Sequence, residues 1–197
     1  MTQAKLHVSP SFYLFWSLFC LLDNEGILPL FLCAAGIHEL GHLIAIYACG
    51  GSVRGVELSA AGAVLEQDKQ LSGLADCAIS LAGPAAGMAA AWVCTIADMP
   101  MLAGANIMLS VLNCLPLLPL DGGCALSGLF CLLPAAVSAS AQIVLMRFSF
   151  FASAALAVCG AALLFGTGRN ATILVIGLFL LHTNRYFLRN SFNYGMI

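Results

Sequence analysis

Three residues of one apolar segment have the types and spacing of a metal-dependent hydrolase. His38 and His42 are four positions apart in the sequence HELGH, and Glu39 directly follows the first histidine. Residues four apart share one face of an α-helix, so both imidazoles can bind a single ion while the carboxylate lies beside them. This H-E-x-x-H pattern is typical of enzymes that hydrolyse amide bonds with zinc.

The surroundings of these residues also favour a bound metal. The segment from Ile27 to Cys49 is otherwise apolar, and a charged group at membrane depth costs about 2.5 to 3.5 kcal/mol. Zn²⁺ bound by imidazole nitrogens and a carboxylate compensates for that cost, and it lowers the pKa of a bound water to about 7. We therefore expect Zn²⁺ as cofactor, His38 and His42 as ligands, and Glu39 as general base.

A third protein ligand has to come from another segment. Asp121 follows a helix end interrupted by two prolines and precedes two glycines. The backbone can leave the helix there and turn the carboxylate toward a polar cavity. Asp121 is the first candidate, and Asp76 is the alternative.

The composition is that of an integral membrane protein. Hydrophobic residues make up 61% of the chain and charged residues 8%, against about 25% charged in soluble domains. A membrane-spanning helix needs about 20 apolar residues, which gives room for about six spans. The chain has no block of like charge, so we expect lipid and peptide partners and no nucleic acid.

Six apolar runs are candidate spans, and the first of them is short enough to be tilted or interfacial. The third is interrupted by Gly83-Pro84. A further apolar segment, Cys124 to Met146, is divided by Pro134 and is either an interfacial helix pair or a seventh span. The six runs are Pro10 to Leu22, Ile27 to Cys49, Leu71 to Ala97, Met101 to Leu120, Phe148 to Gly166, and Ala171 to Leu188.

The positions of the basic residues favour six spans over seven. With six spans and a cytoplasmic N-terminus, only Arg169 among the seven basic residues lies outside, whereas seven spans would place three outside. We expect one all-α membrane domain over residues 1–197 with both termini cytoplasmic. Its zinc-binding core is 27–123, and 124–197 forms the C-terminal helices.

One segment has the pattern of strands instead of helix. Val53 to Leu65 alternates roughly and then gives way to polar residues, which predicts a small β-hairpin or a lone strand at the membrane edge. A helical substrate has to unwind before its amide carbonyls can be attacked. An extended peptide can be held by strand addition, so Val56 and Leu58 are candidate substrate-binding residues.

HELGH in an apolar helix, followed by Asn113 to Gly123 reading NCLPLLPLDGG, resembles the site-2 protease family of intramembrane zinc metalloproteases. That family pairs H-E-x-x-H with a distal N-x-x-P…D-G segment. The six-span plan without a PDZ insertion is most similar to the stage IV sporulation type. Members often carry a CBS domain, which we do not expect here, and a basic segment after D-G-G, which is almost uncharged here.

The resemblance implies a role for each motif residue. His38, His42 and Asp121 would bind zinc, Glu39 would be the general base, and Asn113 would position the substrate or its developing oxyanion. The segment SLAGPAAG, Ser80 to Gly87, would be a helix-packing motif near the site. The substrates would be membrane-associated or transmembrane proteins, and the location a bacterial plasma membrane.

Two other classes of function use the same residues differently. A membrane metal-binding or transport protein would need polar groups on several helices to form a path, and the sequence shows one cluster. A catalytically inactive scaffold is disfavoured because Glu39 is retained.

Overall fold

The computed structural model describes residues 5–10, 12–13, 17, 20–21, 23, 26–59, 62–67, 71–167 and 172–193. The chain forms two compact units, Met1–Asn113 and Cys114–Ile197. The expected first helix, Pro10 to Leu22, lies largely outside the described residues.

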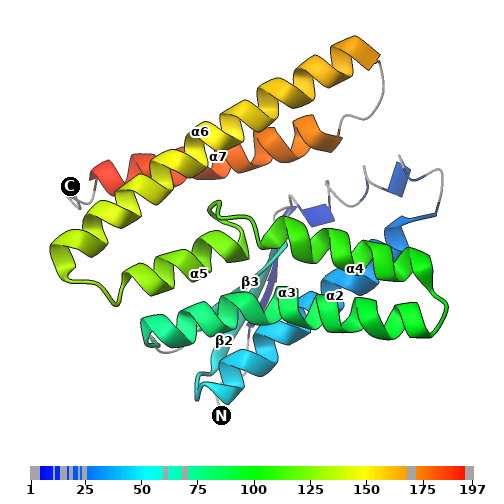
Figure 1. Cartoon of the computed structure of the whole chain (residues 1–197), viewed down its shortest axis with the longest axis horizontal. Helices are drawn as coiled ribbons and strands as arrows, with labels where there is room; N and C mark the ends of the chain where they lie inside the picture. Colours follow the sequence, from blue (N-terminus) through cyan, green and yellow to red (C-terminus); the bar gives the residue numbers. More distant parts are fainter. Residues whose placement is uncertain are drawn as a thin grey trace. The chain divides into compact units, whose positions relative to one another are not determined.

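The first unit packs three helices side by side, as Figure 1 shows. They are α2 (Leu28–Ala48), α3 (Gly73–Ile96) and α4 (Pro100–Asn113). The fourth helix ends at Asn113 instead of Leu120, so the expected span from Met101 to Leu120 is wrong at its C-terminal end. The prolines that follow cannot continue the helix without losing backbone hydrogen bonds.

Two side chains define where these helices begin. The carboxylate of Asp23 accepts hydrogen bonds from the backbone N–H groups of Ile27 and Leu28, both at 2.9 Å. Ser72 caps α3 by accepting from Ala75 N–H at 3.3 Å. Both satisfy donors that a helix start leaves unpaired.

α3 is one continuous helix through Pro84, which corrects the predicted break at Gly83-Pro84. Proline removes one hydrogen bond but leaves the helix intact where neighbouring helices support it. Small residues bring α2 against this part of α3. A Cβ on Gly41 would lie 2.6 Å from the carbonyl oxygen of Ala82 and 2.7 Å from the Cβ of Ala86, so the two backbones approach very closely.

A three-stranded sheet also belongs to the first unit. Its strands are β1 (Lys5–Val8), β2 (Val53–Ser59) and β3 (Gly62–Gln67), in the order β1-β2-β3. β2 and β3 are antiparallel, which confirms the predicted hairpin, while β1 pairs parallel to β2 and was not predicted. A four-residue strand whose partner lies some 50 positions away has no local pattern by which to recognise it.

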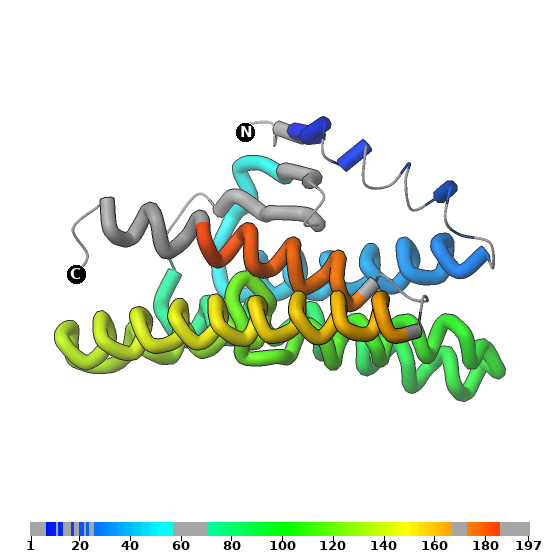
Figure 2. Tube along the Cα trace, turned by 90° about the horizontal axis from the view of Figure 1, so that it is seen from above, coloured from blue at the N-terminus to red at the C-terminus, as the bar shows by residue number. Residues whose placement is uncertain are grey.

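The second unit has a short helix and two longer ones. They are α5 (Asp121–Phe130), α6 (Ala135–Thr167) and α7 (Thr172–Asn193), and Figure 2 shows α6 and α7 running alongside each other. Pro134 separates α5 from α6, so the segment Cys124 to Met146 is neither an independent helix pair nor a seventh span. Its second half is the beginning of α6, joined without interruption to the expected fifth span.

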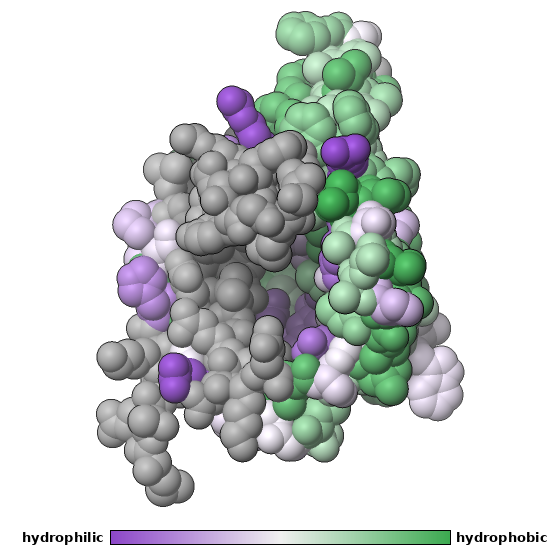
Figure 3. All heavy atoms as spheres, turned by 90° about the vertical axis from the view of Figure 1, so that its left-hand side faces the viewer, coloured by the Kyte–Doolittle hydropathy of each residue, from purple (hydrophilic) through white to green (hydrophobic). Residues whose placement is uncertain are grey.

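Among the described residues, three helices are long and apolar enough to cross a membrane. They are α2, α3 and the Ala135–Gly166 part of α6, while α4 and Ile173–Arg185 are shorter apolar helices. Large hydrophobic side chains on these helices are exposed, including Trp92 and Phe165, and hydrophobic residues cover much of the described surface in Figure 3. Such a surface suits a lipid environment. The plan of six spans stays a prediction.

Candidate metal centre

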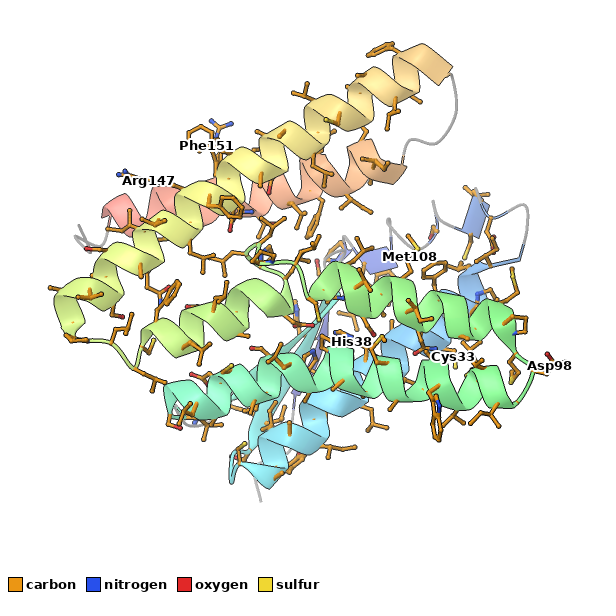
Figure 4. The ribbon with its side chains drawn as sticks, viewed as in Figure 1. Cys33, His38, Asp98, Met108, Arg147 and Phe151 are labelled. Atoms are coloured by element: carbon orange, nitrogen blue, oxygen red, sulfur yellow. The ribbon has the colours of Figure 1, made fainter. Side chains whose placement is uncertain are left out.

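The two motif histidines are buried and face each other. His38 lies near the middle of α2 (Figure 4), and it and His42 are 5% and 8% exposed. Their Nε2 atoms are 3.1 Å apart. Two nitrogen ligands of a tetrahedral Zn²⁺, each about 2.0 to 2.1 Å from the ion, lie about 3.3 to 3.4 Å apart. The pair is therefore close to the spacing that one shared ion requires.

The orientation of the second imidazole is set by α3. His42 Nδ1 donates a hydrogen bond to the backbone carbonyl oxygen of Ile79 at 2.7 Å. A carbonyl only accepts, so the ring hydrogen is on Nδ1 and the lone pair is on Nε2, the atom that faces His38. A carbonyl partner of this kind orients metal-binding histidines in many proteins.

A glycine of α3, Gly83, lies against both rings. A Cβ on Gly83 would overlap Nε2 of His42 and lie 2.8 Å from Nε2 of His38. The missing side chain therefore leaves space beside both Nε2 atoms, where an ion bound by them would lie. Gly83 belongs to the segment Ser80 to Gly87, which lies next to the histidines as the resemblance implied.

Two acidic residues of the first unit, Glu39 and Asp76, are candidates for a role beside the histidines. Glu39 directly follows His38 on α2 and is partly exposed. Asp76, the alternative third ligand, lies in the first turn of α3. It is about 10 Å along the helix axis from Gly83, and a carboxylate there stabilises the helix N-terminus. Its position disfavours Asp76 as a ligand.

Asp121 belongs to the second unit, where it is the first residue of α5 and partly buried. The loop before it folds back on the start of this helix. A Cβ on Gly122 would overlap the carbonyl oxygen of Cys114, and one on Gly123 would lie 2.6 Å from that of Leu117. The two glycines of the D-G-G segment therefore allow the loop to pack directly against the turn that carries Asp121.

Cys124 lies one turn beyond Asp121 on α5. Its thiol donates to the carbonyl oxygen of Pro119 at 3.5 Å. Burial, together with the nearby Asp121 carboxylate, raises the pKa of Cys124 to about 11.

α4 has a stripe of polar residues with helical spacing. Asn106, Ser110 and Asn113 follow one another at four and three positions, which places them on one face. Asn106 and Ser110 are each 1% exposed, and Asn106 Oδ1 and Ser110 Oγ have no hydrogen-bond partner among the described residues. The sequence prediction included only Asn113, although the same spacing pointed to the other two.

Asn113 is the last residue of α4. Its Nδ2 donates to the carbonyl oxygen of Leu109 at 3.0 Å, so one of its two N–H groups is used within the helix. The side chain is partly exposed.

The candidate residues for strand addition lie on the middle strand of the sheet. Val56 pairs with Leu6 of β1 on one side and Leu65 of β3 on the other, and Leu58 pairs with Val8 and Ala63. Both edges of β2 are thus occupied, so a substrate strand cannot be added at Val56 or Leu58. In the described part of the chain, β3 pairs only with β2 and keeps its outer edge.

Comparisons with known proteins identify the fold. No family model matches the sequence, and no curated protein matches it. The structure is similar to the solved "Site-2 Protease from Methanocaldococcus jannaschii", with a TM-score of 0.69 over 92% of this chain and 89% of that chain. The two sequences are 21% identical. The chain therefore has the fold of that site-2 protease.

Proposed function

We propose that the protein is an intramembrane zinc metalloprotease that cleaves membrane-associated or transmembrane protein substrates. The observation that carries the proposal is the pair of Nε2 atoms 3.1 Å apart. These atoms belong to an H-E-x-x-H motif in a helix apolar enough to cross a membrane. The similarity to a site-2 protease fold supports the same reading.

In this proposal His38, His42 and Asp121 hold Zn²⁺. The bound ion would polarise the scissile carbonyl and lower the pKa of a water molecule. The fold similarity covers 92% of the chain, whereas the first unit is 113 of its 197 residues, so the similarity extends into both units. The similarity is therefore consistent with the D-G-G segment supplying the third ligand, as the resemblance implies.

The remaining chemistry is assigned to this chain's own side chains. The Glu39 carboxylate accepts a proton from the attacking water and gives it to the leaving amine. The Ile79 carbonyl holds His42 in the tautomer whose Nε2 can bind the ion. Asn113 keeps one N–H group that can donate to the substrate backbone or to the developing oxyanion.

The substrate would be held in an extended form at the outer edge of β3. A peptide unwound from a helix has backbone groups to satisfy, and an edge strand offers matching ones. Proline substitution at successive positions 63, 64 and 65 tests this assignment. Backbone N–H groups point alternately toward β2 and toward the open edge of the strand. A proline that removes an N–H group on the open edge should lower the cleavage rate without unfolding the protein. A cleavage rate that falls at all three positions in proportion to the loss of thermal stability would contradict the assignment.

The proposed setting is a bacterial plasma membrane, with six spans and both termini in the cytoplasm. Six spans require α4, α7 and the N-terminal apolar run to cross alongside α2, α3 and α6. By analogy with the stage IV sporulation type, sporulation proteins would be the first substrates to test. Labelling of single cysteines placed near each terminus with a membrane-impermeant reagent would test the topology. Both termini should be protected in intact cells and labelled after the membrane is opened.

Glu39→Gln tests the function directly. The variant protein in nanodiscs should bind zinc like the unchanged protein but fail to cleave a panel of labelled single-span peptides. In the alternative of a metal-binding or transport protein, zinc flux into proteoliposomes would persist in the variant and no peptide would be cleaved by either protein. Cleavage retained by Glu39→Gln would disprove the assigned base.

A further inference from the structure

Both backbone groups of one loop residue in the second unit are held by side chains from distant helices. The N–H of Leu118 donates to Ser149 Oγ on α6 at 2.9 Å, and the carbonyl oxygen of Leu118 accepts from Asn184 Nδ2 on α7 at 2.7 Å. We propose that Ser149 and Asn184 are positioning residues that hold Asp121 ready for the metal. This inference rests on the proposed function.

The two side chains are themselves fixed by a buried network. Ser153 Oγ donates to the carbonyl oxygen of Ser149 at 2.6 Å, and Asn184 Nδ2 also approaches Ser153 Oγ at 3.2 Å and the carbonyl oxygen of Leu180 at 2.9 Å. Ser149 and Ser153 are 0% exposed and Asn184 is 1% exposed. Carbonyl oxygens only accept, so the amide nitrogen of Asn184 has to face Leu118.

The bonds to Leu118 go beyond what packing of α6 against α7 requires. Serine and asparagine often join apolar helices by bonding each other across the interface. Here the shortest bond made by Asn184 is instead to a loop carbonyl 66 residues away in sequence. An irregular loop among apolar helices has backbone groups that need such partners.

The held residue is mechanically connected to the proposed ligand. Leu118 is three positions before Asp121, and Leu120 N–H donates to the carbonyl oxygen of Leu117 at 2.8 Å. Gly122 and Gly123 pack against the backbone of the same loop. In sequence, Asp121 therefore lies between Leu118, which α6 and α7 hold, and Gly122 and Gly123, which pack against the loop. A shift of Leu118 would move the carboxylate of Asp121.

Zinc affinity provides a readout that does not depend on cleavage. Asn184→Leu removes the donor to the Leu118 carbonyl, and Ser149→Ala removes the acceptor for its N–H. Each should weaken zinc binding by the full-length protein in nanodiscs by about 10- to 100-fold, measured by competition with a chelator.

Matched controls lie on the same helices. Thr183 on α7 and Ser140 on α6 donate only to carbonyls of their own helix, Phe179 at 3.1 Å and Ala136 at 2.9 Å. Thr183→Val and Ser140→Ala should leave zinc affinity within about threefold of the unchanged protein, since each removes a hydroxyl that bonds its own helix and not Leu118.

A double-mutant cycle separates positioning from general destabilisation. In an Asp121→Asn background, Asn184→Leu should cause no further loss of zinc affinity, because its effect acts through Asp121. Additive losses would overturn the inference, as would unchanged affinity in both single variants. If Asn184→Leu does not fold, Ser149→Ala takes its place in the cycle.

The cycle also distinguishes this inference from the proposed function. If Asp121→Asn weakens zinc binding but Asn184→Leu and Ser149→Ala do not, the metal site stands and the positioning role is wrong. If Asp121→Asn has no effect on zinc affinity, the ligand assignment fails and the positioning role fails with it.

Discussion

His42 and Ile79 are joined by a 2.7 Å hydrogen bond from the imidazole Nδ1 to the main-chain carbonyl oxygen. This bond links the motif helix α2 to α3 and decides which nitrogen of His42 can bind a metal. The H-E-x-x-H motif provides the imidazole, and a backbone group of another helix provides its orientation.

The tautomer of His42 should be visible by NMR. In selectively ¹⁵N-labelled protein without zinc at neutral pH, Nδ1 of His42 should carry the hydrogen and Nε2 should have the shift of an unprotonated nitrogen. Addition of zinc should change the Nε2 resonance and leave Nδ1 protonated. A hydrogen on Nε2 in the metal-free protein would contradict the orientation described above.

Gly83→Ala should strongly weaken zinc binding. The added methyl group would overlap Nε2 of His42 and approach that of His38, so the rings or α3 have to move. We expect zinc affinity to fall by at least about 100-fold. Substituting a residue that only orients a metal ligand typically lowers the affinity by about 10- to 100-fold. Gly36→Ala is the matched control on α2, since its Cβ would meet nothing within 4 Å. Equal affinity for the two variants would show that the space beside Gly83 is not needed.

Gly87→Ala should destabilise the packing of α3 against α4. A Cβ there would overlap Ser110 Oγ but lie 3.7 Å from Ser110 Cβ, an ordinary contact. We expect a loss of about 1 to 3 kcal/mol in the free energy of unfolding. Ser110→Ala in the same chain should restore most of it, as thermal unfolding in detergent can measure. Failure of this rescue would show that another contact is responsible.

Zinc should stabilise the folded protein, because the unfolded chain does not keep the ligands together. At a free zinc concentration about 100 times its dissociation constant, the gain should be about 2.7 kcal/mol. Removal of zinc with a chelator should lower Tm, and readdition should restore it. His38→Ala should have a Tm that zinc does not change. A zinc-dependent rise in Tm in that variant would place the binding elsewhere.

Local spacing was enough to predict part of the site, and long-range contacts account for what was missed. The i, i+4 relation of His38 and His42 follows from helix geometry alone, as does the alternation that predicted the hairpin. The Ile79 carbonyl and Gly83 act through close packing of α3 on α2, which no spacing within α2 specifies. Asn184 reaches a residue 66 positions away, so its role was not recognisable from its own apolar helix.

Errors at helix boundaries have a similar cause. Pro134 predicts a division of the apolar segment, and it does separate α5 from α6. Pro84 predicts a break in α3, but the helix continues through it because packing supports the altered turn. The edge of β2 appeared available for a substrate because its partner β1 had no signal of its own in the sequence.

The length of α4 has a consequence for the surrounding lipid. Its 14 residues extend about 21 Å, whereas the hydrocarbon layer of a typical bilayer is about 30 Å thick. In the proposed six-span arrangement, lipid beside so short a helix would be thinner, since a bilayer can relieve such a mismatch by thinning. In that arrangement a substrate helix beside α4 would meet a thinner apolar layer, in which its unwound peptide groups would lie closer to water.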